Sequence, residues 1–433
     1  MRQQKALTII TRLKPDADNI KDLGEFLHQI GHHKKNPYVR FDEIGTTCFA
    51  AWILLNNDPH YPPSLVFECN HEGDVEEYLN DFISHAGPAL HRIYRHCMDY
   101  TAARQNDAYL KTYLKAHRQD YAAFYIGCPY QSQHGILESA RARSLIQKFV
   151  GPQSKGCDQP QELRRDIEQR LRNERIGSFD GLITPLWKLR ARVFLNLLSL
   201  AAFILLGIFI LYRLAPSVLE YSASLLVTGI IALLLIIRIK EIREPKPDPN
   251  RYGKIDPLLF RSEDIFQQNH LTTLVEIKPG IVSPFVLKVW LWIINAAARL
   301  RYITGHLGGI PTIHFARWLI IDTDMPIQRL LFLSNFDGSW HSYLGDFVDK
   351  AAFGLNGIWG NTVEFPPTKF LFGGGANQIV EFKQWSRDHN LYTHVWYEAY
   401  QVTVKNILKN VEIADKIGKD LSPAATNEWL SLL

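Results

Sequence analysis

The chain has 433 residues, and its 48 basic and 44 acidic side chains give a formal net charge of +4. This length allows two or three domains, and the near balance of charge gives no indication of a nucleic-acid partner. Five cysteines, the last of them Cys157, form no CxxC pair, which favours a reduced cytoplasmic setting over a disulfide framework.

Residues 1–130 predict one α+β module. Its strands are expected at 7–13, 47–55, 64–69 and 121–127, and its helices at 19–30, 74–94 and 108–117. Apolar residues recur at helical spacing from Ile20 to Ile30. The resulting order β-α-β-β-α-β is that of a ferredoxin-like module. Such a sheet carries helices on one face and leaves the other bare, so we expect a second sheet to cover it.

Residues 131–190 predict a charged helical linker. Leu163, Ile167 and Leu171 form a thin apolar stripe among many charges. A stripe of this kind can dock on the barrel that the paired sheets would form or lie on a membrane surface. We expect it to dock.

Residues 191–243 predict a transmembrane hairpin. Two apolar runs, Val193–Leu214 and Leu219–Ile237, are each about 20 residues long, which is the length needed to cross a hydrocarbon core. A hairpin buried in a large soluble core is the alternative. Basic residues flank both runs on the side away from the turn: Lys188, Arg190, Arg192, Arg238, Lys240 and Arg243. Because such residues collect on the cytoplasmic side, we expect an integral membrane protein with two spans and both termini in the cytoplasm.

After a proline-rich spacer at 244–267, residues 268–415 predict a second module that repeats the first, followed by a C-terminal tail at 416–433. Strands are expected at 271–277, 312–321, 329–334 and 394–400, helices at 284–302, 340–357 and 378–389, and an added strand-like piece at 369–372. Leu65, Asn70 and Gly73 recur as Leu330, Asn335 and Gly338, about 265 residues later. We expect the two ferredoxin-like modules to pair as an α/β barrel, within one chain or between chains of a homo-oligomer.

The helix expected at 284–302 differs from its counterpart in the first module because it is apolar nearly all round. Trp290 and Trp292 lie near its start, and Lys288, Arg299 and Arg301 are its charges. Tryptophan favours the membrane interface, so the helix could lie there. A helix buried between the barrel and the linker is the other interpretation.

The best local motif for a site runs from Ser334 to Trp340, at the end of a strand. Asp337 in this motif is a candidate catalytic acid or a helix cap. Asn335 with Gly338 fits a turn that needs a left-handed residue, and Asn335 is also a candidate cofactor-binding residue. His314 and Arg317 lie in one strand, where alternation places them on opposite faces. Each is either a site residue or a hydrogen-bonded core residue. No P-loop, zincin or serine-hydrolase motif occurs, and no metal site is expected.

The duplicated modules resemble the dye-decolorising peroxidases, which are haem proteins built from two such modules. That family has a GxxDG motif whose Asp assists peroxide cleavage, and Ser334-Asn335-Phe336-Asp337-Gly338 resembles it with Ser in place of the first Gly. The resemblance implies haem, with Asp337 and Arg317 at the reacting side. It implies a histidine ligand, for which His314, His389 and His394 are available.

Three functions follow from these patterns. The leading hypothesis is a membrane protein whose cytoplasmic barrel binds a hydrophobic or redox-active small molecule near the lipid bilayer. The first alternative is a haem-dependent, peroxidase-like oxidoreductase. The second is a non-catalytic scaffold with a solid barrel.

Overall fold

The computed structural model describes residues 3–31, 35–56, 58–101, 106–150, 159–177, 179–214, 216–244 and 267–433. Cys157 and most of the predicted proline-rich spacer lie outside these residues. The described part is an α+β protein with antiparallel sheets and two long apolar helices between its halves, as the sequence predicted at this coarse level.

The first sheet has the strand order β1-β3-β2-β10. Its strands are β1 (Gln4–Arg12), β2 (Thr47–Leu55), β3 (Ser64–Glu72) and β10 (Thr393–Glu398). The second sheet has the order β4-β6-β7-β5. Its strands are β4 (Ala123–Ile126), β5 (Gln268–Glu276), β6 (Ile313–Ile321) and β7 (Arg329–Asp337). All neighbouring strands in both sheets are antiparallel.

Each half gives its last strand to the other half's sheet. β4 pairs with β6, and β10 pairs with β2. We expected these strands to complete the sheets of their own modules, and that placement is wrong. In their place, the backbone before each exchanged strand lies along the free edge of β1 or β5. Gln119 N donates to Thr8 O at 2.8 Å, and Leu391 N donates to Thr272 O at 2.9 Å. These bonds satisfy edge groups that would otherwise be open to pairing with another chain.

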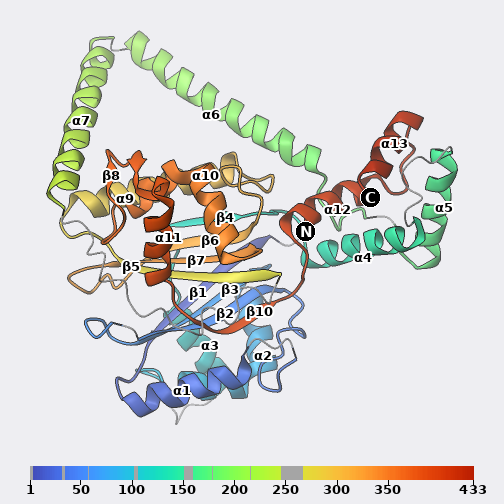
Figure 1. Ribbon diagram of the computed structural model, residues 1–433, viewed down its shortest axis with the longest axis horizontal. Coiled ribbons are helices and arrows are strands. Elements are labelled where there is room, and N and C mark those ends of the chain that lie inside the picture. The colour runs from blue at the N-terminus through green and yellow to red at the C-terminus, as the bar shows by residue number, and fades with distance from the viewer. Residues whose placement is uncertain are drawn as a thin grey trace.

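The sheets and their helices form four layers (Figure 1). The first helix layer covers the first sheet and contains α1 (Ala17–Ile30), α2 (Val75–Tyr94) and α3 (Asp107–Ala116). The second helix layer covers the second sheet and contains α9 (Val282–Leu300), α10 (Trp340–Trp359) and α11 (Ile379–Asp388). A short hairpin of β8 (Thr368–Lys369) and β9 (Gly373–Gly374) and a 3₁₀ turn (Gly375–Asn377) lie beside α10.

The predicted linker docks on the C-terminal helices. It forms α4 (Gln133–Val150) and α5 (Pro160–Asn173), which pack on α12 (Val404–Lys416) and α13 (Pro423–Ser431) beside the sheets. Ile167 and Leu171 are buried, and the buried Arg164 donates to Lys416 O at 2.6 Å. The linker therefore docks on the protein as predicted, but its main partners are the C-terminal helices rather than the barrel. The expected C-terminal tail contains a packed helix.

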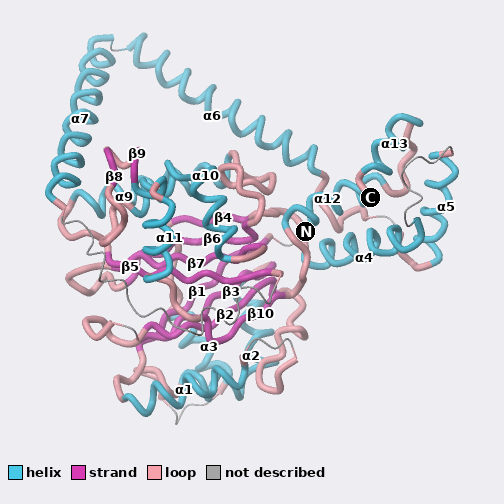
Figure 2. Tube along the Cα trace, in the orientation of Figure 1, coloured by secondary structure: helices cyan, strands magenta, loops and turns pink. Residues whose placement is uncertain are grey.

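The two apolar runs form α6 (Leu186–Leu214) and α7 (Pro216–Arg243). Both are long and apolar enough to cross a membrane, and only 6% of the most hydrophobic window of each is buried inside the protein. Figure 2 shows them meeting at a tip far from the strands and diverging from it, so that the other end of α7 lies beside α9 and β8 while the other end of α6 lies toward α12.

Candidate functional site between the sheets

The inner faces of the two sheets pack against each other through apolar side chains. Phe49 of β2 and Phe315 of β6 lie with their ring centroids 5.7 Å apart, and both belong to one hydrophobic cluster that spans the two sheets. Trp396 of β10 stacks on Phe49 at 5.5 Å. The space that a barrel ligand would need is thus occupied by aromatic rings.

Arg317 lies on this inner face and is 1% exposed. Its Nη1 donates to Leu7 O at 3.0 Å and to Thr8 Oγ1 at 2.9 Å, so the side chain reaches across to β1 of the first sheet. Its Nη2 donates to Cys69 O and Asn70 Oδ1 and lies 3.3 Å from Glu68 Oε2. Every contact that anchors this guanidinium therefore comes from the first half.

Glu68 is the acid of a buried charged cluster. Its Oε1 lies 2.8 Å from His270 Nε2 and accepts a hydrogen bond from Asn335 Nδ2 at 3.0 Å. Burial alone would raise the pKa of Glu68, but the Arg317 guanidinium, then His270, outweigh it and bring that pKa down to about 2. Burial lowers the pKa of Arg317, while Glu68 raises it. The ion pair accordingly persists within the sheet interface at neutral pH.

Asn335, a candidate ligand-binding residue, contacts its sequence counterpart. Asn70 Nδ2 donates to Asn335 Oδ1 at 2.7 Å. The two residues occupy equivalent register positions, because Asn70 pairs with Ala6 and Asn335 pairs with His270. The contact therefore lies where the two sheets meet at matching positions.

Asp337 and His314 come together at a second polar cluster. His314 Nε2 lies 2.8 Å from Asp337 Oδ1, and Gln268 Nε2 lies 3.0 Å from His314 Nε2. Gln268 also donates to Val402 O at 3.0 Å. His314 is 2% exposed and Asp337 is 6% exposed. An imidazole and a carboxylate at this distance could move a proton, but both groups are closed off from solvent.

The strand alternation predicted from sequence misplaced His314. A register shift between Ile313 and Phe315 inserts an irregularity into β6. Such a bulge redirects the side chain at the irregularity, and the His314 ring accordingly lies 5.2 Å from that of Phe49, near the inner face. Arg317 lies on the same side as Phe315, as predicted.

The turn after Asp337 has the predicted geometry. Gly338 has φ of 82° and Gly73, its counterpart, has φ of 89°. This left-handed region favours glycine because it carries no Cβ. Ser339 caps α10 by accepting a hydrogen bond from Ser342 N.

Asp337 caps a helix other than the one that follows it. Its Oδ2 accepts a hydrogen bond from Val404 N, the first residue of α12, at 2.7 Å. Glu72, at the same place in the first half, accepts from Gln133 N, the first residue of α4. A carboxylate at a helix N-terminus is stabilised by the helix dipole and by the free backbone N–H groups. Both acids therefore hold the helices that follow the exchanged strands.

His389 and His394 are not part of either cluster. His389 ends α11, where its Nδ1 lies 2.8 Å from Trp385 O and its Nε2 lies 3.5 Å from Glu364 Oε2. His394 lies against Tyr392, with ring centroids 5.0 Å apart, and lines a surface hollow beside α1. The grouping of these histidines with Asp337 that the peroxidase resemblance implied is absent from the described structure. Together with the filled sheet interface, this arrangement does not fit haem between the sheets.

Sequence reasoning missed the residues that complete these clusters, which are Glu68, His270 and Gln268. Glu68 gave a usable signal, because it is the single charge within the apolar run Leu65–Cys69. A buried charge must be paired, so such a position predicts a partner on a facing element. His270 and Gln268 gave none, since they lie at the start of a strand where polar residues are common.

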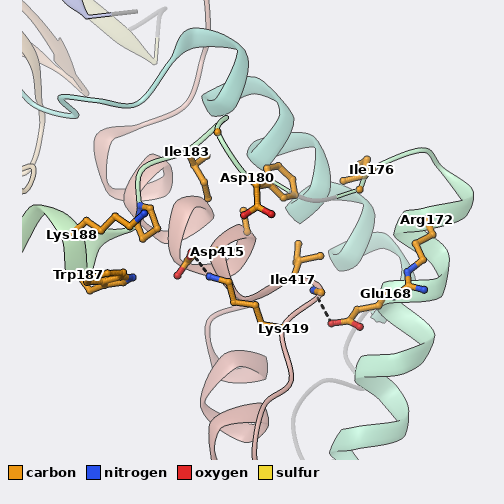
Figure 3. A pocket seen from close by; sticks show the side chains of 16 residues that line it. Glu168, Arg172, Ile176, Asp180, Ile183, Trp187, Lys188, Asp415, Ile417 and Lys419 are labelled. Carbon is orange, nitrogen blue, oxygen red and sulfur yellow. Dashed lines mark hydrogen bonds and ion pairs between the residues drawn. The ribbon is translucent and has the colours of Figure 1, made fainter. Parts of the chain in front are cut away.

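One of three described hollows lies at the foot of α6 rather than between the sheets. It has a volume of about 460 Å³ and is lined by parts of α5, the segment that follows it, the start of α6 and the end of α12. Figure 3 shows Trp187 and Lys188 on one side of it and Glu168 and Arg172 on the other. None of the three described hollows is lined by His314, Arg317 or Asp337.

Comparison with known proteins identifies no relative: no protein-family model, curated protein or solved structure matches the chain.

Proposed function

We propose that the protein is a membrane-anchored, non-catalytic scaffold that holds a solid α/β body at the cytoplasmic face of a bilayer. In this proposal α6 and α7 cross the membrane, and the two sheets form a closed, ferredoxin-like pair whose interior is filled. The observation that carries it is the burial of every candidate catalytic side chain. Asp337, His314 and Arg317 are at most 6% exposed and each bonds to groups of the protein itself.

The anchor is supported by the exposure of its helices. Leaving so many large apolar side chains in water is unfavourable, and a bilayer would cover them. The basic residues Arg238 and Lys240 lie at the end of α7 nearest the body, and Lys188 lies at the corresponding end of α6. By the preference of such residues for the cytoplasmic side, the body lies in the cytoplasm and the tip lies outside.

The orientation is tested by labelling intact cells with a membrane-impermeant maleimide. Ser217→Cys places a thiol at the exposed start of α7, near the tip, and Glu25→Cys places one on exposed α1. The four described native cysteines are buried, so their background reaction should be low. We expect label on the Ser217→Cys chain in intact cells, and on the Glu25→Cys chain only after permeabilisation. The reverse result would overturn the proposed orientation.

The absence of catalysis is tested by adding haem and then peroxide to the detergent-purified full chain. A scaffold should give no Soret band of bound haem and no peroxide-dependent dye oxidation above that of free haem. A bound haem spectrum whose activity disappears in the Asp337→Asn variant would overturn the proposal and support the peroxidase alternative.

A second candidate function, binding of a small amphiphilic molecule near the bilayer, is supported by the hollow at the foot of α6. Its volume of about 460 Å³ lies within the usual range for ligand sites. Phe179 and Ile183 supply apolar lining, while Arg172 and Lys188 supply positive charge. Mass spectrometry of the purified chain, compared with an Ile183→Trp variant that fills the hollow, tests this function. A ligand retained by both proteins would be bound elsewhere.

A further inference from the structure

The second helix layer exposes an unusual set of large apolar side chains. We call this set the apolar platform. Its members come from α9, α10, the β8–β9 hairpin and the start of α11: Ile281, Phe285, Val289, Trp292, Ile293, Phe353, Phe370, Phe372, Ile379 and Val380. Ile281 is 87% exposed, Val380 is 74% exposed and Trp292 is 69% exposed. Exposed apolar patches on this scale mark sites that contact a partner or a membrane.

Helix α9 has two different apolar faces. Leu287 and Leu291 are buried against the second sheet and its helices. Phe285, Val289 and Trp292 have the spacing i, i+4 and i+7, which places them on one stripe of the opposite face. The inward face accounts for folding, so the outward stripe needs another explanation.

The first helix layer provides an internal control. None of the large apolar side chains of α1, α2 and α3 is exposed in the same way. Outward positions there carry charges such as Lys21 and Glu25 on α1 and Glu76 on α2. Since both layers cover similar sheets, packing on a sheet does not itself require an apolar outer face.

The platform is continuous with the helix that we propose crosses the membrane. Ile237 of α7 packs with Val286 of α9 and Leu371 of the β8–β9 hairpin. Glu241 of α7 holds this hairpin, because its carboxylate accepts hydrogen bonds from Thr368 Oγ1 at 2.7 Å and from Phe370 N at 2.8 Å. Helix α6 also contacts α9. The elements that carry the platform therefore contact both apolar helices, and they lie on the side of the body from which these helices project (Figure 1).

The charges near the platform are complementary to an anionic lipid surface. Lys288 and Arg299 are exposed on α9, which contains no acidic residue, and Arg301 is exposed directly after it. Lys369 is exposed on the β8–β9 hairpin, and Glu381 on α11 is the exposed acid beside Val380. Tryptophan and basic residues beside an apolar stripe are typical of helices that lie in a membrane interface.

We infer that the apolar platform inserts into the headgroup–acyl boundary of the cytoplasmic leaflet. Its occupant is lipid, and α9 lies along the membrane plane while α6 and α7 cross it. This inference rests on the proposed function, because it requires the bilayer that those helices span. It adds that the body is seated on the membrane in one orientation, with the second sheet toward the lipid and the first helix layer toward the cytoplasm.

The test uses single introduced cysteines that carry an environment-sensitive fluorophore, with the full chain in lipid nanodiscs. Cys157 is replaced by Ser in every variant, and the four described native cysteines are buried. Phe285→Cys, Trp292→Cys and Val380→Cys report the platform from two separate helices. Leu225→Cys, which is 75% exposed in the unsubstituted chain, reports α7, and Glu25→Cys on α1 is the matched control outside the membrane. All these positions are exposed, so the substitutions should leave the core intact.

We compare fluorescence in nanodiscs with and without a lipid that carries a nitroxide near the glycerol. Because an interfacial helix buries its apolar face by roughly 5–10 Å, the platform labels should lose about half of their fluorescence while the Glu25 label is unchanged. A second lipid carries its nitroxide in the acyl chain and reports the proposed membrane span α7. If this lipid quenches the Leu225 label but neither lipid quenches the platform labels, the inference about the platform is overturned and the transmembrane anchor stands.

If this lipid does not quench the Leu225 label, the transmembrane anchor is overturned and, with it, this inference. Quenching of the Glu25 label to the same extent as the platform labels would also overturn the inference about the platform. If the platform labels instead lose fluorescence when labelled copies are mixed without nitroxide, a second copy of the chain covers the platform in place of lipid.

Discussion

The first and second sheets are built on the same antiparallel pairing, but the helices that cover them meet different surroundings. α1 and α2 present charges to solvent, whereas α9 and the start of α11 present Phe285, Trp292 and Val380. The sheets constrain only the inward face of each helix. Packing on a sheet does not determine the residues of the outward face, and in the second helix layer many of these residues are apolar.

The inner faces differ as well, at positions that the strand register matches. Glu68 pairs with Ala51 in the first sheet, and Leu333 pairs with Arg317 in the second. The first sheet thus supplies the buried acid and the second supplies the buried base. One charge on each side ties the two sheets together, which two identical sheets could not do.

The largest expected effect comes from breaking that pair. Arg317→Met removes the guanidinium and leaves the Glu68 carboxylate buried without its main counter-charge, which should destabilise the fold by about 3–5 kcal/mol. Urea unfolding in detergent measures the loss. Glu68→Gln combined with Arg317→Met removes both charges and should recover part of the stability, since an apolar or neutral pair avoids the cost of burying ions. A double variant as unstable as the single one would show that Arg317 acts through its contacts to Leu7 and Thr8 instead.

The second prediction concerns His71 of the first half, whose counterpart in the second half is Phe336. His71 stacks on Tyr78 with ring centroids 4.4 Å apart, and its counterpart Phe336 stacks on Tyr343 at 3.9 Å. Burial lowers the pKa of His71 from 6.5 to about 4. Between these values the unfolded chain binds a proton that the folded chain does not, so stability falls as the pH drops from 6.5 to 4.

His71→Phe keeps the ring and removes the proton, so it should abolish this part of the pH dependence, which amounts to roughly 3 kcal/mol at most. Unfolding measured at several pH values between 4 and 7 checks it. Burial also lowers the pKa of His96 and His306, so a smaller slope should remain in the variant. An unchanged slope would assign the acid sensitivity to those two histidines and, toward pH 4, to Glu68 with its lowered pKa.

The sequence predicted the positions of the strands and helices better than it predicted which strands pair. Apolar periodicity located the strands and most helices because each buries one face locally. It could not show that β4 and β10 exchange sheets, since an apolar strand pairs equally well with either free edge. It brought Asp337 and His314 forward as candidates, but the bulge at Ile313 that joins them depends on tertiary pairing. Whether a polar group is a site or part of the core depends on burial, which a sequence without relatives does not reveal.

The third prediction concerns the acids that end β3 and β7. Asp337→Asn and Glu72→Gln each remove the charge from a helix N-terminus while leaving an oxygen that can accept the hydrogen bond. Each should therefore cost only about 1–2 kcal/mol, through lost interaction with the helix dipole and a weaker hydrogen bond. Similar losses for the two variants, measured by urea unfolding, would support a shared structural role. A loss of more than that for Asp337→Asn alone would mean that its contact with His314 is the stronger one.

The smallest expected effect is the most informative about the outer faces. Trp292→Ser changes a side chain that is 69% exposed, so the free energy of unfolding in detergent should shift by less than about 0.5 kcal/mol. Its neighbour Leu291 is buried, and Leu291→Ala should cost about 2–5 kcal/mol in the same assay. If Trp292→Ser proved as destabilising as Leu291→Ala, the stripe on α9 would belong to the folded core, and the contrast between the two helix layers would lose its meaning. A neutral result would leave folding unable to explain why tryptophan is exposed there, which is the outcome that the proposed contact with lipid requires.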